Sequence, residues 1–160
     1  MNIIPAHTPE HIAAVRILFR EYERFLDVDL CFQSFEDELA GLPGKYAPPE
    51  GALLLALEET EVCGCVALRR LEPRVCEMKR LFVRPPHRGR GLGRALSEAI
   101  IAEAYAKGYA AMRLDTLAQL NKAIQLYERL GFRKIAPYYH NPLPGVSYWE
   151  LDLKAWKESI

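Results

Sequence analysis

The residues most suggestive of chemistry form a glycine-rich turn between an apolar strand and a helix. The segment reads MKRLFVRPPHRGRGLGRAL and begins at Met78. Its glycines are Gly89, Gly91 and Gly93, and the arginines among them are Arg88, Arg90 and Arg94. Glycines spaced in this way let the backbone approach a ligand and direct several N–H groups toward one point at a helix N-terminus. Because guanidinium groups also bind phosphate oxygens, the segment predicts a phosphate-binding turn.

Two common phosphate loops do not fit this spacing. A dinucleotide-binding fingerprint that began at Gly89 would need a small residue where Arg94 stands, and one that began at Gly91 would need it at Leu96. A nucleoside-triphosphate loop would need Gly-Lys-Ser or Gly-Lys-Thr, which the sequence lacks. The remaining pattern is Arg-x-x-Gly-x-Gly, which begins at Arg88.

Positive charge is concentrated around this turn, although the formal net charge of the chain is zero. Residues 69–94 hold nine Lys or Arg side chains against two carboxylates, whereas residues 1–68 hold four basic and twelve acidic side chains. A local excess of positive charge suits a small polyanion such as a nucleotide cofactor. A solvated basic face remains the simpler alternative.

Length and composition indicate one globular domain over residues 1–160. Half of the residues are hydrophobic and 26% are charged, which disfavours a disordered or fibrous chain. The first residues carry no basic start followed by an apolar run, so we expect no secretory signal. The sequence has no run of eighteen apolar residues, which disfavours a membrane span. We therefore expect a cytoplasmic protein that does not bind a membrane.

The cysteines do not suggest a metal site. They are Cys31, Cys63, Cys65 and Cys76, with no C-x-x-C pair and no histidine at zinc spacing. Three of them lie in apolar runs, where free cysteine packs as a small hydrophobic residue. We expect buried thiols and no metal.

Periodicity and turn residues predict an α/β fold. The expected elements are strand 1–5, helix 9–26, a short helix around 35–39, strands 52–57, 62–68 and 75–83, a helix from 92 to about 107, strand 111–116, helix 121–130, and strands 132–139 and 146–153. Thr8, Ser34 with Asp37, and Asn121 are the expected helix caps. The order β-α-α-β-β-β-α-β-α-β-β predicts a mixed sheet, antiparallel at first, with helices on both faces.

Two blocks of this sequence resemble the signature blocks of the GNAT superfamily of N-acetyltransferases. One is Arg88-x-x-Gly91-x-Gly93 after a strand, and the other is NKAIQLYERLGF, which begins at Asn121. The resemblance implies that acetyl-CoA is the cosubstrate and that Asn121 contacts its arm. It also implies two groups of cofactor-binding residues, the strand end Leu81, Phe82 and Val83, and the turn Arg88, Gly89, Arg90, Gly91, Leu92, Gly93 and Arg94.

Tyr127 is the candidate general acid. In the family, a tyrosine at this position often protonates the departing thiolate. A phenol with a pKa of about 10 is a workable proton donor to a thiolate whose conjugate thiol has a pKa near 8.5. The alternative is that Tyr127 is one residue on the apolar face of its helix.

Glu77 is the candidate base that removes a proton from the acceptor amine, through a raised pKa or through a water molecule. The alternative is an exposed strand glutamate that balances Lys79 or Arg80. His140, in a loop that commonly walls the acceptor pocket in the family, is a second candidate base, with an exposed loop histidine as its alternative. An acidic cluster in residues 21–38 suggests attraction of a cationic acceptor, or only a solvated helix face.

Two classes of function follow from these residues. The first is an enzyme that moves acetyl from acetyl-CoA to a primary amine of a small molecule or peptide within a ternary complex. The second is a regulatory module that binds acyl-CoA without turnover. Nucleic-acid binding is disfavoured, because the basic segment has no interleaved aromatic residues and the net charge is zero. A homodimer is an assembly that the sequence leaves open.

Overall fold

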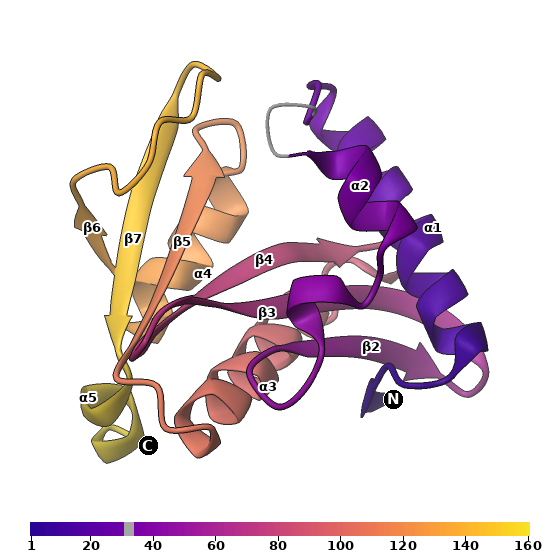
Figure 1. Ribbon diagram of the computed structural model, residues 1–160, viewed down its shortest axis with the longest axis horizontal. Helices are drawn as coiled ribbons and strands as arrows, with labels where there is room; N and C mark the ends of the chain where they lie inside the picture. Colours follow the sequence, from indigo (N-terminus) through magenta and orange to yellow (C-terminus); the bar gives the residue numbers. More distant parts are fainter. Residues whose placement is uncertain (31–33) are drawn as a thin grey trace.

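The computed structural model describes residues 1–30 and 34–160, so Cys31 lies outside the described residues. In this part of the chain, seven strands form one sheet in the order β1-β2-β3-β4-β5-β7-β6 (Figure 1). The strands are β1 Asn2–Pro5, β2 Ala52–Glu58, β3 Glu61–Glu72, β4 Val75–Val83, β5 Ala111–Leu117, β6 Arg133–Ile135 and β7 Val146–Asp152. The helices are α1 Pro9–Leu26, α2 Phe35–Ala40, α3 Leu92–Ala106, α4 Asn121–Leu130 and α5 Leu153–Glu158, with short 3-10 turns η2 Gly44–Tyr46 and η3 Pro85–His87. None of the described helices is long and apolar enough to cross a membrane.

The predicted order of elements is confirmed, and local sequence explains the best-placed boundaries. Thr8 caps α1, because its hydroxyl accepts a hydrogen bond from the His11 N–H at 3.1 Å, and Pro9 occupies the first helical position. The helix ends where Asp27 adopts a left-handed conformation. Sheet pairing is antiparallel from β1 to β4 and parallel between β4 and β5, so the mixed sheet is also confirmed.

Two apolar layers cover the two faces of the sheet. One face packs against α3, α4 and α5 through residues such as Leu96, Ile100 and Trp156. The other packs against α1 and α2 through residues such as Phe19 and Phe35. Cys63, Cys65 and Cys76 are all fully buried in these layers, as predicted.

The sheet opens between β4 and β5. These strands pair in parallel over only three positions, of which the last joins Glu77 to Arg113. Beyond Glu77 the two strands diverge, and Figure 1 shows β5 and β7 rising away from the end of β4. The backbone groups of both strands are therefore unpaired with each other along the opening, which leaves room for a ligand.

A β-bulge distorts β4 along this opening. Cys65 is opposite Phe82, but Ala67 is opposite Lys79, so β4 holds one more residue than β3 over this interval. Arg80 lies in the bulge with φ of 60°, a conformation that is costly for a residue with a long side chain.

The bulge changes which side chains share a face. Met78 and Leu81 pack in the layer that contains α3. Between them, Lys79 lines a cavity together with residues of α2, and Arg80 pairs with Glu38 of α2. Two consecutive cations therefore face α2, where a regular strand would send one to each face.

The end of the chain differs from the prediction in two respects. The strand expected over 132–139 shortens to β6, because Pro137 has no N–H to donate and the tyrosines that follow turn toward carboxylates in the sheet. The last strand ends at Asp152, whose carboxylate caps the unpredicted helix α5 by accepting from the Ala155 N–H at 3.0 Å.

Two expected caps are also wrong in detail. Asn121 is the first residue inside α4, and Leu120 occupies the cap position. Ser34 precedes α2 in a left-handed conformation and makes no capping bond through its side chain. The Asn121 side chain is therefore not used as a helix cap.

Candidate active site

A cleft of about 630 Å³ occupies the opening between β4 and β5. Ten of the predicted cofactor-binding or catalytic residues line it: Leu81, Phe82, Val83, Arg88, Gly89, Gly91, Leu92, Gly93, Asn121 and Tyr127. They come from β4, the glycine turn, the start of α3, and α4, which lie far apart in the sequence. The structure thus brings both sequence blocks to one cavity.

The glycine turn ends at the N-terminus of α3. Gly89 and Gly91 have φ of +79° and +80°, and Gly91 is the residue before the helix. These conformations favour glycine strongly over residues that carry a Cβ. The first N–H groups of a 15-residue helix, together with its dipole, favour an anion at this end of the cleft.

Arg88 lines the cleft and ties the turn to β4. Its Nε donates to the Val83 carbonyl at 2.8 Å, and its guanidinium lies 4.4 Å from the centre of the Phe25 ring and 5.6 Å from that of Phe82. These contacts hold the guanidinium at the anion-binding end of the cleft.

Arg90 and Arg94 are placed differently from Arg88. Arg90 forms a two-pronged pair with Glu58, with both N–O distances at 3.0 Å. Arg94 binds Glu98, one turn along α3, at 3.0 Å. Neither arginine lines the cleft, although the glycine spacing alone had suggested that both reach phosphate oxygens.

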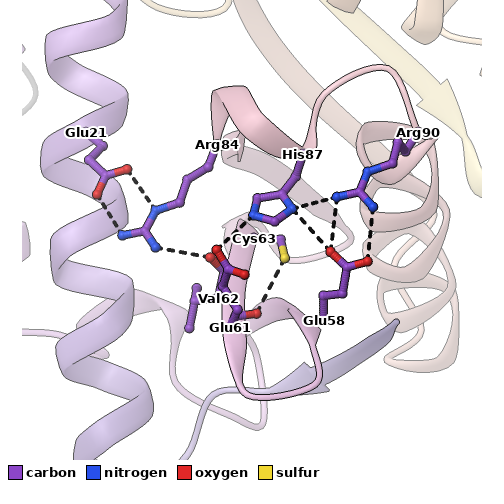
Figure 2. A network of polar contacts seen from close by, with 8 residues as sticks. All are labelled: Glu21, Glu58, Glu61, Val62, Cys63, Arg84, His87 and Arg90. Carbon is purple, nitrogen blue, oxygen red and sulfur yellow. Dashed lines mark hydrogen bonds and ion pairs between the residues drawn. The ribbon is translucent and has the colours of Figure 1, made fainter.

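A polar network that was not predicted joins the glycine turn to neighbouring strands (Figure 2). His87, only 5% exposed, lies with its Nδ1 2.9 Å from Arg90 and its Nε2 3.3 Å from Glu61. Because arginine can only donate, Nδ1 accepts and Nε2 carries the hydrogen. The network therefore connects the turn to the hairpin between β2 and β3.

The same network reaches α1 through Arg84. This guanidinium forms two bonds to Glu21, at 2.9 and 2.7 Å, and donates to the Val62 carbonyl at 3.1 Å (Figure 2). The pair fixes α1 against the end of the hairpin. Glu58 and Glu61 gave no signal in the sequence, because their partners Arg90 and His87 lie more than twenty residues away.

Glu58, Cys63 and His87 place possible metal-binding atoms within 4.8 Å of one another. In the structure, Arg90 donates to both the Glu58 carboxylate and the His87 Nδ1. Burial raises the pKa of the Cys63 thiol, and its Sγ lies 3.4 Å from the Glu61 carbonyl. The Arg90 guanidinium therefore already donates to two of the three groups that could bind a metal ion.

A second cavity, of about 520 Å³, lies over β3 and β4 between α2 and the loop that follows β6. Its lining includes the acidic and basic residues Asp37, Glu38, Lys45, Arg69, Glu77 and Lys79, and the tyrosines Tyr46, Tyr138 and Tyr139. Within the described residues, Lys79 is the one residue that lines both cavities. The two cavities therefore adjoin at Lys79.

Glu77 lies at the last paired position of β4 and β5, which we call the vertex of the opening. It is buried, with only 1% exposure. Its carboxylate accepts from Arg69 Nε at 2.8 Å and from the Tyr138 hydroxyl at 2.6 Å. Burial raises the pKa of Glu77, but the charges of Lys79 and Arg69 outweigh burial and leave the pKa below its ordinary value. The exposed strand glutamate and the raised pKa that the sequence suggested are therefore both wrong.

Tyr127 lies on α4 and is 6% exposed. Its ring packs against Phe132, with 5.6 Å between ring centres. Burial raises the pKa of the phenol, which keeps it protonated at neutral pH. The residue thus packs on the apolar face of its helix and also lines the cofactor cleft, so the two readings of Tyr127 do not exclude each other.

The loop after β6 is held by Asp115 of β5. Tyr139 and Asn141 both donate to the Asp115 carboxylate, and the Asn141 bond is 2.9 Å long. His140 lies between them in sequence but is exposed, and it lines neither cavity. The structure therefore gives no support to His140 as a base in either cavity.

The acidic cluster is partly neutralised. Its ion pairs to arginine are Glu21 with Arg84, Glu36 with Arg20, and Glu38 with Arg80. Paired carboxylates attract a further cation only weakly, so the cluster gives little support to a cationic acceptor.

Comparison with known proteins decides the family. The model of the acetyltransferase (GNAT) family matches residues 12–132, which is more than half of the chain. The chain belongs to the GNAT family of acetyltransferases. An uncharacterized N-acetyltransferase of Schizosaccharomyces pombe is 42% identical to it over 96% of this chain and 95% of the relative. This family member is accordingly an acyltransferase.

More distant relatives and solved structures are also similar to this chain, and those below 25% identity share its fold. The N-acetylaspartate synthetase of Homo sapiens is 35% identical over 69% of this chain, which spans 37% of that protein. A putative acyl-CoA N-acyltransferase from Klebsiella pneumoniae is 27% identical, with a TM-score of 0.72 over 95% of this chain and 97% of that one. YncA of Salmonella typhimurium, solved with its cofactor acetyl-CoA, has a TM-score of 0.67 at 21% identity over 96% of this chain and 95% of its own.

Proposed function

We propose that this GNAT enzyme transfers acetyl from acetyl-CoA to a primary amine by direct attack within a ternary complex. The observation that carries the proposal is the meeting of two cavities at Lys79, one with an anion-binding helix end and the other with a buried carboxylate. Two substrates can then meet at the vertex of the opening without a covalent enzyme intermediate.

The residues of the first cavity fit acetyl-CoA. The N–H groups of the glycine turn would hold the pyrophosphate, with Arg88 adding charge. The unpaired edge of β4 from Leu81 to Val83 would bind the amides of the pantetheine arm by hydrogen bonds, and Asn121 would contact the same arm from α4. The thioester would then lie near the bulge at Arg80, between the two cavities.

The second cavity would bind the acceptor, whose ammonium must lose a proton before the nitrogen attacks the thioester carbonyl. The lowered pKa of Glu77 keeps its carboxylate ionised at neutral pH and makes it a weak base. The carboxylate also already accepts hydrogen bonds from Arg69 and Tyr138. We infer that it acts through a water molecule. The new C–N bond forms as the C–S bond breaks, and Tyr127 donates its proton to the departing thiolate.

The acceptor proposed is a small molecule or a peptide that presents a primary amine. Relatives named N-acetylaspartate synthetase support a small acceptor, because that name describes the acetylation of an amino acid. The second cavity, at about 520 Å³, is also of a size that suits a small ligand.

An assay of thiol release tests the proposal. Acetyl-CoA and a panel of amines should give free coenzyme A in proportion to acetylated product, and omission of the amine should abolish both. Acetyl-CoA that raises the unfolding temperature but yields no product with any amine would instead favour the non-catalytic acyl-CoA-binding module.

A further inference from the structure

The carboxylate of Asp115 uses only one of its two oxygens in contacts with the protein. Asp115 lies on β5 and is partly buried. The Tyr139 hydroxyl and the Asn141 side-chain amide both donate to Oδ2, the amide at 2.9 Å. Within the described residues, Oδ1 accepts no hydrogen bond, forms no ion pair and is not enclosed by protein atoms. One oxygen is therefore held in place while the other is left for a ligand.

Both donors to Asp115 are neutral, so neither cancels the negative charge of the carboxylate. A phenol and an amide orient a carboxylate, whereas a guanidinium also compensates its charge. Glu77 and Glu38, which line the second cavity, are each bound by an arginine. Asp115 therefore differs from these two carboxylates, because its negative charge is fixed in position but not paired with a cation.

Asp115 lies where the two cavities adjoin. It lines the cofactor cleft, and Tyr139, which donates to it, lines the second cavity. Along β5, Asp115 is two residues beyond Arg113, whose pairing with Glu77 is the last between β4 and β5. The carboxylate is thus just past the vertex of the opening. A group bound to it lies next to the place proposed for the thioester.

The charge of Asp115 also acts into the cofactor cleft. Burial is the largest cause that raises the pKa of Tyr127, and the charge of Asp115 adds to it. Burial raises the pKa of Tyr22 to about 12, with the charge of Arg80 opposing the shift and that of Asp115 reinforcing it. Both tyrosines line the cleft. A carboxylate that disfavours negative charge on these groups stabilises a positive charge placed between them.

We propose that Asp115 binds the ammonium of the acceptor through Oδ1 and positions its nitrogen at the thioester. The inference rests on the proposed acetyl transfer. An ammonium has three N–H groups, so an amine that has lost one proton to the water beside Glu77 still donates to Oδ1. Its lone pair is then free to attack the carbonyl carbon. Asp115 thereby selects acceptors with a charged amino group over neutral molecules of the same shape.

Asp115→Asn separates this role from a purely structural one. The amide oxygen of the variant can accept both bonds that Oδ2 now accepts, so the loop after β6 stays in place. At the position of Oδ1 the variant carries an NH2 group, which donates hydrogen bonds and cannot bind an ammonium. Glu128→Gln is the matched loss of one negative charge, because Glu128 is exposed on α4 and lines neither cavity.

Binding to the complex with coenzyme A tests the proposal without chemistry. The amines L-aspartate, L-leucine and tyramine are paired with L-malate, L-2-hydroxy-4-methylpentanoate and tyrosol, in which a hydroxyl replaces the amino group. The pair whose amine is acetylated fastest is used, and each Kd is measured from the shift in unfolding temperature. Wild type should bind the amine roughly 10- to 100-fold more tightly than the alcohol, the range expected for a hydrogen bond between charged groups. Asp115→Asn should remove this difference, and Glu128→Gln should retain it.

Steady-state kinetics check that the same contact operates during turnover. Asp115→Asn should raise KM for the amine by roughly 10- to 100-fold, for the same reason, while KM for acetyl-CoA stays at the wild-type value. The shift in unfolding temperature that acetyl-CoA causes should be unchanged, which verifies that the variant is folded and that its cofactor cleft is intact.

The outcomes separate this inference from the proposed function. Equal affinity of the wild type for the amine and its alcohol overturns the inference and leaves acetyl transfer intact, and this comparison needs no variant to fold. Wild-type KM for the amine in Asp115→Asn also overturns it, even if kcat falls, because the carboxylate would then act in a step other than binding. If no amine is acetylated, the proposed acetyl transfer falls, and the inference falls with it.

Discussion

Substituting Gly91, just before α3, should destabilise the protein, whereas substituting Gly93, inside α3, should not. Gly91 has φ of +80° and no atom near an added Cβ, so Gly91→Ala introduces backbone strain without a steric clash. The left-handed conformation costs an alanine about 1–2 kcal/mol. For a protein of this size, that loss lowers the unfolding temperature by about 2–8 °C.

Gly93→Ala is the matched control two residues away. Gly93 lies inside α3, and an added Cβ would meet Leu126 Cδ2 at an ordinary contact distance of 3.9 Å. Alanine is favoured over glycine in a helix by up to about 1 kcal/mol, so this variant should be as stable as wild type or slightly more stable.

Thermal unfolding of the ligand-free proteins, with urea unfolding as a second measure, checks both values. The reasoning is refuted if Gly91→Ala unfolds at the wild-type temperature, or if Gly93→Ala is destabilised as much as Gly91→Ala. The same experiment with acetyl-CoA tests the cleft. At a hundredfold excess over Kd, the wild type should gain about 2.7 kcal/mol, and Gly91→Ala should gain less if the turn binds the pyrophosphate.

Two further predictions concern a phenolic group and a buried ion pair. Tyr127→Phe should lower kcat by about 10²- to 10⁴-fold in the thiol-release assay while the acetyl-CoA-induced shift in unfolding temperature stays the same, and an unchanged kcat would exclude Tyr127 as the acid. Arg80→Met should lower the free energy of unfolding by about 3–5 kcal/mol, because it leaves Glu38 without its partner. The double variant with Glu38→Met should recover much of that loss in urea unfolding, and a double variant as unstable as Arg80→Met would contradict this account.

Much of the fold follows from short-range sequence signals. Thr8 and Pro9 begin α1 as predicted, and the apolar run 75–83 matches β4 at both ends, because caps and hydrophobic periodicity act over a few residues. The glycine turn could be predicted for the same reason, since glycines permit the positive φ values that Gly89 and Gly91 adopt.

The arrangement of charged groups where the two cavities meet depends on contacts between distant segments. Glu77 is held by Arg69 of the neighbouring strand and by Tyr138, 61 residues away, and these contacts add to the charge of Lys79 in lowering the pKa of Glu77. Arg90 matches the phosphate-binding pattern in the sequence, but in the structure it pairs with Glu58, which lies 32 residues earlier.

The sequence by itself determined the family, the order of elements and the turn that begins α3. Only the tertiary structure decided which charges meet at the centre. The single extra residue in β4 puts Lys79 and Arg80 on one face, and its place depends on the register against β3 rather than on any local preference of the chain. The sequence shows how many charges are available, but the register between strands determines which of them lie side by side.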